Sequence, residues 1–229
     1  MQPQGSVAWH RFATLADASE ALAEAVAIRL RALLAGQGRA SLAVPGGTTP
    51  ARFLAALGSR DLAWENVTLL PTDERFVAAD DEASNERMIR AQFAPLREGR
   101  VGFLSFHDHG SDIEAAAAAL ASDLASLPPL DLVVSGMGSD GHIASLFPGE
   151  EARFEALPDS GICIATPPGL PPRLSLSPAR LSGAGWASLL VSGAQKEAVL
   201  KAASDRPVPL PVDLLLGRPQ GLDVYWAKG

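Results

Sequence analysis

Apolar residues follow a helical period in some parts of the chain and form short continuous runs in others. The longest helical pattern extends from about residue 17 to residue 35, where apolar side chains recur on one face. Asp17 with Glu20 forms a possible capping box at its start, and Gly36 is a natural end. Short apolar runs alternate with helical patterns throughout the sequence. This alternation predicts an α/β fold with a mostly parallel sheet.

The remaining predicted elements continue the alternation. Strands are predicted at residues 41–44, 66–72, 132–134, 162–165, 173–177, 188–192 and 222–227, the last of which is expected to close the sheet. Further helices are predicted after Thr49 with Pro50 in the first position, at 84–93, from a cap at Ser111 to about Leu127, and at 194–203. No repeat or long linker interrupts the chain. Residues 1–229 are therefore expected to form a single Rossmann-like domain, a mostly parallel sheet flanked by helices, with additional short strands after a central turn.

The charge balance argues against several classes of partner. The 229 residues carry a formal net charge of −7, so nucleic acid and anionic membranes are poor partners. No apolar run approaches the ~18 residues of a membrane span, and the first residues lack the pattern of a secretory signal. The one cysteine, Cys163, lies in an apolar run, which favours a core residue in a reducing cytoplasm. An anionic small substrate would require cations gathered locally.

A glycine-rich turn after the strand at 132–134 carries the most informative chemistry in the chain. His142 lies in this turn, two residues after Asp140. A strand end, exposed amides and a histidine beside a carboxylate are the parts of an acyl-transfer site. The alternative is that His142 only caps a turn. The glycines whose amides could approach a ligand closely are Gly136, Gly138 and Gly141.

The same turn also matches the dinucleotide-binding pattern GxGxxG, as GMGSDG. In a dinucleotide fold this turn opens a long helix, and an acidic residue follows about 20 residues on, at the end of the next strand. Here Pro148 would end a helix after roughly two turns, and the next strand ends in Ala165, Thr166 and Pro167. We interpret the match as false.

Two other strand ends lead into helices at positions suited to phosphate. Residues 46–50, GGTTP, place two glycines and two hydroxyls before a helix N-terminus, whose amides and dipole favour anions. The alternative is a tight turn with Thr49 as the N-cap. Lys196 lies in the first turn of the helix at 194–203, where a cation opposes the helix dipole unless an anion is bound. The alternative is a solvated lysine paired with Glu197.

The segment TDERF, residues 72–76, follows a predicted strand directly. At least one of Asp73, Glu74 and Arg75 should therefore face a cleft at the carboxyl edge of the sheet. The alternative is an exposed ion pair, and the acidic segment 79–87 is expected to be a solvated loop. His107 and His109 have a spacing that could hold a metal, but without a nearby third ligand they indicate a polar loop. We expect no metal site and no cofactor.

Five motifs occur in the following order along the chain: SLAVPGGTTP, TDERFV with SNERM, GMGSDGHIASLFPG, RLSLS and SGAQKEAVL. Together they resemble the motifs of 6-phosphogluconolactonase, within the wider superfamily of glucosamine-6-phosphate deaminase. The deaminases look similar as far as GHIA but continue toward Phe-Asn-Glu-Pro, whereas this chain reads SLFPG and looks like the lactonase. The departures are Pro45, Ala78 and Ala83, which concern loop detail.

The resemblance implies hydrolysis of 6-phosphoglucono-1,5-lactone in the oxidative pentose phosphate pathway. It implies His142 as general base, with Asp140 in its turn and Asp73 also at the catalytic site. The sugar-phosphate lactone would be the only partner, bound by a monomer or weak homo-oligomer. Amides of Gly136, Gly138 and Gly141 could stabilise the oxyanion. The resemblance places the following residues at the substrate or its phosphate: Gly46, Gly47, Thr48, Arg75, Asn85, Arg173 and Lys196.

Two other functions remain open at this point. One is an aminosugar-phosphate deaminase or isomerase, although no acidic residue directly follows Phe147. The other is a non-catalytic sugar-phosphate sensor, although the region before the first helix offers no DNA-binding helix pair.

Overall fold

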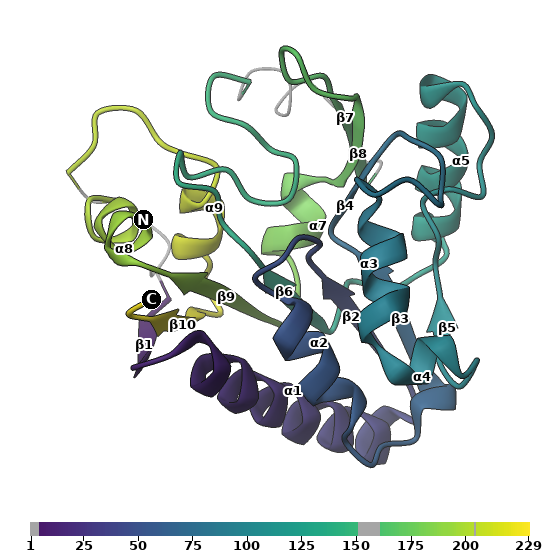
Figure 1. The fold of residues 1–229 in the computed structure, drawn as a ribbon, viewed down its shortest axis with the longest axis horizontal. Coiled ribbons are helices and arrows are strands. Elements are labelled where there is room, and N and C mark those ends of the chain that lie inside the picture. Colours follow the sequence, from purple (N-terminus) through teal and green to yellow (C-terminus); the bar gives the residue numbers. More distant parts are fainter. Residues whose placement is uncertain (1–4, 151–160, 204) are drawn as a thin grey trace.

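A parallel β-sheet forms the centre of the molecule (Figure 1). The computed structural model describes residues 5–150, 161–203 and 205–229. Seven strands lie in the order β1-β10-β9-β6-β2-β3-β5, and each pair of neighbours is parallel. The fold is therefore α/β with a mostly parallel sheet, as the alternation predicts. The strands are β1 (Val7–Phe12), β2 (Ala40–Val44), β3 (Val67–Pro71), β5 (Gly102–Phe103), β6 (Leu132–Ser135), β9 (Trp186–Ser192) and β10 (Leu222–Ala227).

Three short strands form a second, antiparallel sheet in the order β4-β8-β7. Two of them, β7 (Ile162–Ala165) and β8 (Arg173–Leu176), are the strands predicted after the central turn. The third, β4 (Asp73–Arg75), was not predicted as a separate strand. It begins two residues after β3 ends and pairs with β8, so the TDERF segment belongs to the second sheet.

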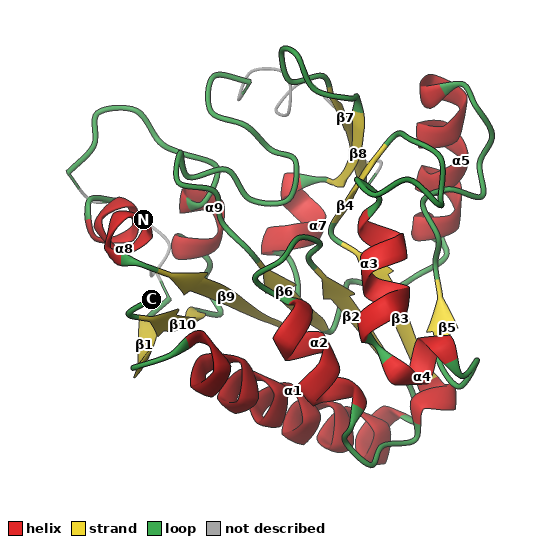
Figure 2. Ribbon diagram, in the orientation of Figure 1, coloured by secondary structure: helices red, strands yellow, loops and turns green. Residues whose placement is uncertain are grey.

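Helices cover both faces of the central sheet (Figure 2). Successive strand residues face opposite layers: Leu42 packs with α1 and α2, whereas Ala43 packs with α5, α7 and α9. Each layer has its own buried apolar cluster. None of the described helices is long and apolar enough to cross a membrane. The helices are α1 (Leu15–Gln37), α2 (Ala51–Gly58), α3 (Asn85–Gln92), α4 (Ala94–Arg97), α5 (Ile113–Ala125), α7 (Pro178–Ser182), α8 (Ala194–Lys201) and α9 (Asp213–Leu216), with a 3-10 turn η1 (Trp64–Asn66).

The caps of α1 differ from those predicted. Thr14 is the N-cap, and its hydroxyl accepts a hydrogen bond from the amide of Asp17 (3.1 Å), so the box of Asp17 with Glu20 is wrong. The helix passes through Gly36 and ends at Gly38, which has a φ of 76° and donates its amide to Leu34. A left-handed C-cap favours glycine, and Gly38 adopts that conformation whereas Gly36 does not. Similarly, Asp112 and not Ser111 caps α5.

The sequence does not predict the first strand, β1, because its apolar and polar residues follow no strand pattern. β1 lies at the edge of the sheet, and none of its six residues is fully buried. β10 was expected to close the sheet, but it lies inside, between β9 and β1. The short elements β5, α4, α7 and α9 were also not predicted. Cys163 is buried in β7, as expected of a core residue.

Candidate active site

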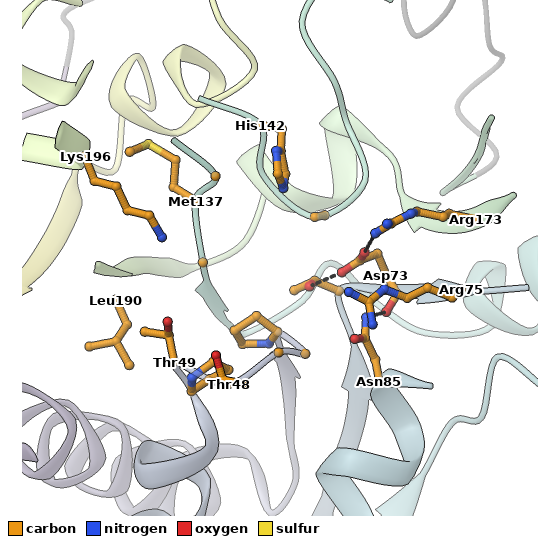
Figure 3. Close-up of a pocket in the computed structure, with 18 residues that line it drawn as sticks. Thr48, Thr49, Asp73, Arg75, Asn85, Met137, His142, Arg173, Leu190 and Lys196 are labelled. Atoms are coloured by element: carbon orange, nitrogen blue, oxygen red, sulfur yellow. Dashed lines mark hydrogen bonds and ion pairs between the residues drawn. The ribbon is translucent and has the colours of Figure 1, made fainter. Parts of the chain in front are cut away.

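A cavity of about 280 Å³ opens at the carboxyl edge of the central sheet, where β2, β3, β6 and β9 end (Figure 3). Ligands of α/β folds bind at this edge because the loops after parallel strands meet there. Most residues predicted for the site line this cavity. They are Gly46, Gly47, Thr48, Asp73, Arg75, Asn85, Gly136, Gly138, His142, Arg173 and Lys196.

Asp140 lies behind His142 and orients its ring. The Nδ1 atom of His142 lies 2.7 Å from Oδ1 of Asp140, and the amide of His142 donates to the same oxygen (3.2 Å). Burial alone would raise the pKa of Asp140, but hydrogen bonds from His142 and its charge outweigh burial and hold that pKa below the ordinary value. The ionised carboxylate of Asp140 accepts a hydrogen bond from Nδ1 of His142 when that atom carries the ring proton. The Nε2 atom is then left as the proton acceptor.

The path of the turn depends on two glycines. A Cβ on Gly138 would lie 2.2 Å from Cε1 and Nδ1 of the His142 ring and 2.5 Å from Oδ1 of Asp140. Gly141 has a φ of 87°, and a Cβ there would lie 2.6 Å from a side-chain atom of Leu210. The ring of His142 can therefore occupy its position only because residue 138 has no side chain.

Gly138→Ala should lower kcat for the lactone hydrolysis expected from the sequence by about tenfold or more. The added methyl group would displace the His142 ring from the position in which it can act on the substrate. Gly36→Ala is the matched control, since a Cβ at Gly36 would have no heavy atom within 4 Å. Steady-state kinetics on the folded variants tests this. A Gly138→Ala variant with normal kcat would show that the close contact does not fix the ring.

The oxyanion prediction needs correction for two of its three amides. The amide of Gly138 donates to the carbonyl of His142 (2.9 Å), and the amide of Gly141 donates to the carbonyl of Gly138 (3.1 Å). Gly141 is also not among the described residues that line the cavity. Both donors are used inside the turn and are not free for an oxyanion. Only Gly136 remains from the predicted set.

Asp73 is held on one wall of the cavity by its neighbours. It is 6% exposed, and its Oδ2 accepts a hydrogen bond from the buried hydroxyl of Ser145 (2.6 Å) and lies 3.9 Å from Nη1 of Arg173. Its backbone carbonyl accepts from Nδ2 of Asn85 (2.7 Å). The Oδ1 atom of Asn85 is buried and has no hydrogen-bond partner among the described residues. The Asp73 carboxylate is therefore held in a defined orientation on this wall.

The cations of the cavity lie on two sides of His142. Figure 3 shows Arg75 and Arg173 beside Asp73, and Lys196 on the opposite side of His142. Burial, with the charge of Arg75, lowers the pKa of Arg173. Because Arg75 and Lys196 lie on opposite sides of His142, the phosphate group of a ligand would bind on one side of the cavity and would not bridge these two cations.

The alternative interpretation of Lys196 as a partner of Glu197 is wrong. Glu197 contacts Arg11 (2.8 Å) and Lys201 (2.7 Å) instead. Lys196 is half-buried and forms no ion pair within the described part of the chain. Burial lowers the pKa of Lys196, and the nearby charge of Asp140 opposes this shift. A partly desolvated cation without an ion-pair partner in the described residues favours an anionic ligand.

Three further predictions concern residues around the cavity. Residues 80–82 are exposed as expected, but Ser84, Asn85 and Glu86 are buried, so the segment 79–87 is not wholly a solvated loop. His107 pairs with Glu74 (3.1 Å). No cluster of three or more His, Cys, Asp or Glu suited to a metal occurs among the residues described. No helix follows β6 between residues 136 and 150, all of which are described, which agrees with rejecting the dinucleotide motif.

Sequence reasoning missed several residues of the site. Phe147 packs against the His142 ring (centroids 4.8 Å apart), and the guanidinium of Arg173 lies 5.6 Å from the same ring of Phe147. Ser145, which holds Asp73, is adjacent to Ala144, whose φ of 48° is unusual for a residue other than glycine. The apolar lining from Met137 and Leu190 was also not predicted. Only the proximity of Ser145 and Phe147 to His142 in the sequence could have indicated them.

Comparison with known proteins assigns the chain to a family. Residues 13–226 match the model for glucosamine-6-phosphate isomerases/6-phosphogluconolactonase. The chain belongs to this family. It is 38% identical over 226 residues to a 6-phosphogluconolactonase of Rhizobium meliloti, a match that covers 95% of this chain and 97% of the relative. It is 37% identical to a 6-phosphogluconolactonase of Mesorhizobium japonicum, over 96% and 94% of the two chains.

The fold agrees with a solved structure of the same family. A 6-phosphogluconolactonase from Shewanella baltica superposes with a TM-score of 0.88 at 30% identity, and the match covers 99% of each chain. The fold of this chain therefore matches that of the solved 6-phosphogluconolactonase over nearly its whole length.

Proposed function

We propose that this chain hydrolyses 6-phosphoglucono-1,5-lactone to 6-phosphogluconate in the oxidative pentose phosphate pathway, with His142 as general base. The observation that carries the proposal is the His142 ring, oriented by Asp140, on a cavity with cations on two sides. The curated relatives named 6-phosphogluconolactonase support the same substrate.

The reaction needs one proton acceptor. Water attacks the lactone carbonyl carbon while Nε2 of His142 takes a proton from it. The tetrahedral intermediate then collapses, the bond between the carbonyl carbon and the ring oxygen breaks, and the proton returns from His142 to that oxygen. A lactone is an activated ester, so the step requires no covalent nucleophile. Because two turn amides are occupied, we assign the developing oxyanion to the side of Arg173, which shares the Phe147 ring with His142.

The two sides of the cavity would bind different parts of the substrate. Lys196, Thr48 and the glycines before α2 would hold the phosphate, which carries about −1.5 to −2 charge. Asp73, Arg75, Asn85 and Arg173 would face the sugar ring. A phosphate anchored on one side fixes the carbonyl near His142 and makes the attack effectively unimolecular.

The family name also includes an aminosugar-phosphate activity, which is the second candidate. It is less well supported because Pro148 and Gly149 follow Phe147, and Phe147 itself packs on His142. Asp140 is the carboxylate in contact with that histidine.

Freshly prepared 6-phosphogluconolactone tests the proposal when its hydrolysis is compared with spontaneous ring opening. We expect an enzyme-dependent rate that is proportional to protein concentration, and no ammonia from millimolar glucosamine 6-phosphate. Steady ammonia release at a rate comparable with lactone hydrolysis would overturn the assignment in favour of a deaminase.

A further inference from the structure

A buried carboxylate lies directly behind the sugar side of the cavity. Glu74, in β4, is 1% exposed, yet its two oxygens accept hydrogen bonds from three backbone amides. These belong to Arg75 (2.7 Å), Asn85 (2.8 Å) and Glu86 (2.7 Å). One side chain therefore joins the short strand β4 to the first turn of α3. A carboxylate at a helix N-terminus is stabilised by the free amides and the dipole there.

His107 completes this cluster from the loop between β5 and α5. Its Nε2 atom lies 3.1 Å from Oε2 of Glu74 and 3.1 Å from the hydroxyl of Ser84, which also donates to Glu74 (3.1 Å). The hydrogen bond to Glu74 raises the pKa of His107, against the effect of burial, and the charges of Glu74, Glu86 and Asp108 add to the rise. Burial would raise the pKa of Glu74, but His107 and the amides outweigh it and lower that pKa. Both shifts favour a charged pair.

The cluster connects to the substrate residues through the chain itself. Arg75 follows Glu74 directly and donates from its guanidinium to the carbonyl of Ala83. Asn85, whose amide binds Glu74, donates from its side chain to Asp73. Glu74, Ser84 and His107 are not among the described residues that line the cavity. Their hydrogen bonds and chain neighbours lead to the cavity through Arg75 and Asn85.

We propose that Glu74 and His107 are positioning residues for the lactonase reaction, which hold Arg75 and Asn85 in place to bind the sugar without contacting it themselves. The inference rests on the proposed function. Loss of Glu74 removes the link between β4 and the first turn of α3. Loss of His107 leaves the Glu74 carboxylate buried without its charged partner, so either loss should shift Arg75 and Asn85. His142 and Asp140 belong to a different loop and Arg173 is fixed in β8, so the larger effect should fall on substrate binding and not on the general base.

Two substitutions of His107 test the proposal. His107→Ala should raise KM for the lactone, and Kd for 6-phosphogluconate in calorimetry, by about tenfold, the size of one lost charged hydrogen bond. kcat should change by less than about threefold, since the base is untouched. His107→Gln can still donate to Glu74 and should restore most of the affinity. Glu74→Gln should show the same loss as His107→Ala, because an amide cannot accept from all these donors.

His10→Ala is the matched control. His10 also lies 2.7 Å from a carboxylate, that of Asp223, but on the edge strand β1. It should leave KM unchanged. An equal rise of KM in His10→Ala and His107→Ala, or no rise in His107→Ala and Glu74→Gln, overturns the positioning role. A wild-type chain that does not hydrolyse the lactone overturns the proposed function and this inference with it, so the two failures are distinguishable.

Discussion

Replacing His142 by alanine should lower kcat for 6-phosphogluconolactone by about 10²–10⁴-fold, the usual share of a general base. KM should change little, because the phosphate and sugar contacts lie on other residues. The reason is geometric: Asp140 holds Nδ1 at 2.7 Å, which leaves Nε2 as the proton acceptor on the cavity. Stopped assays on fresh lactone, corrected for spontaneous hydrolysis, measure the loss.

Two further variants separate this role from a structural one. Asp140→Asn keeps the size of the side chain but no longer favours a proton on Nδ1, so it should lower kcat and preserve product binding. His10→Ala removes another histidine that is paired with a carboxylate, on the edge strand β1, and should leave kcat unchanged. A His142→Ala enzyme with near-normal kcat would exclude His142 as the base and direct attention to Asp73.

The position of the site could be predicted because strand ends are readable in the sequence. The residues after β2, β3, β6 and β9 meet at one edge of a parallel sheet, whatever the details of their loops. This rule predicts from the sequence that His142, Asp73 and Lys196 lie close together, and all three line the cavity. It could not tell which turn amides remain free, since the donation from Gly138 to His142 depends on φ and ψ at each residue.

The directions of the side chains within the site also cannot be predicted from the sequence. Asp73, Glu74 and Arg75 are consecutive, but as a strand they alternate: Asp73 and Arg75 line the cavity, and Glu74 points to α3. The sequence showed no strand there because three residues are too few for a pattern. The separation of Arg75 from Lys196 likewise depends on the second sheet, which moves Arg75 away from the edge that carries Lys196.

Lys196→Ala should raise KM for the phosphorylated lactone by about 10–100-fold, as expected for loss of a charged hydrogen bond to phosphate. KM for unphosphorylated glucono-1,5-lactone should rise by less than about threefold. Lys201→Ala is the matched control, because Lys201 lies on the same helix and pairs with Glu197 away from the cavity. Equal losses for both lactones would mean that Lys196 supports the fold and does not bind phosphate.

The depressed pKa of Lys196 adds a pH signature to this test. Burial favours the neutral amine, so the charge is lost at lower pH than in an exposed lysine, and affinity for 6-phosphogluconate should fall as pH rises through that range. A bound phosphate favours the charged form and raises the pKa again, so binding at alkaline pH should take up a proton. Calorimetry in buffers of different ionisation enthalpy measures that uptake. Wild type and Lys201→Ala should show it and Lys196→Ala should not. Arginine stays charged throughout this range, so uptake that persists without Lys196 would show that another group takes up the proton and that Lys196 is not the amine that pairs with the phosphate.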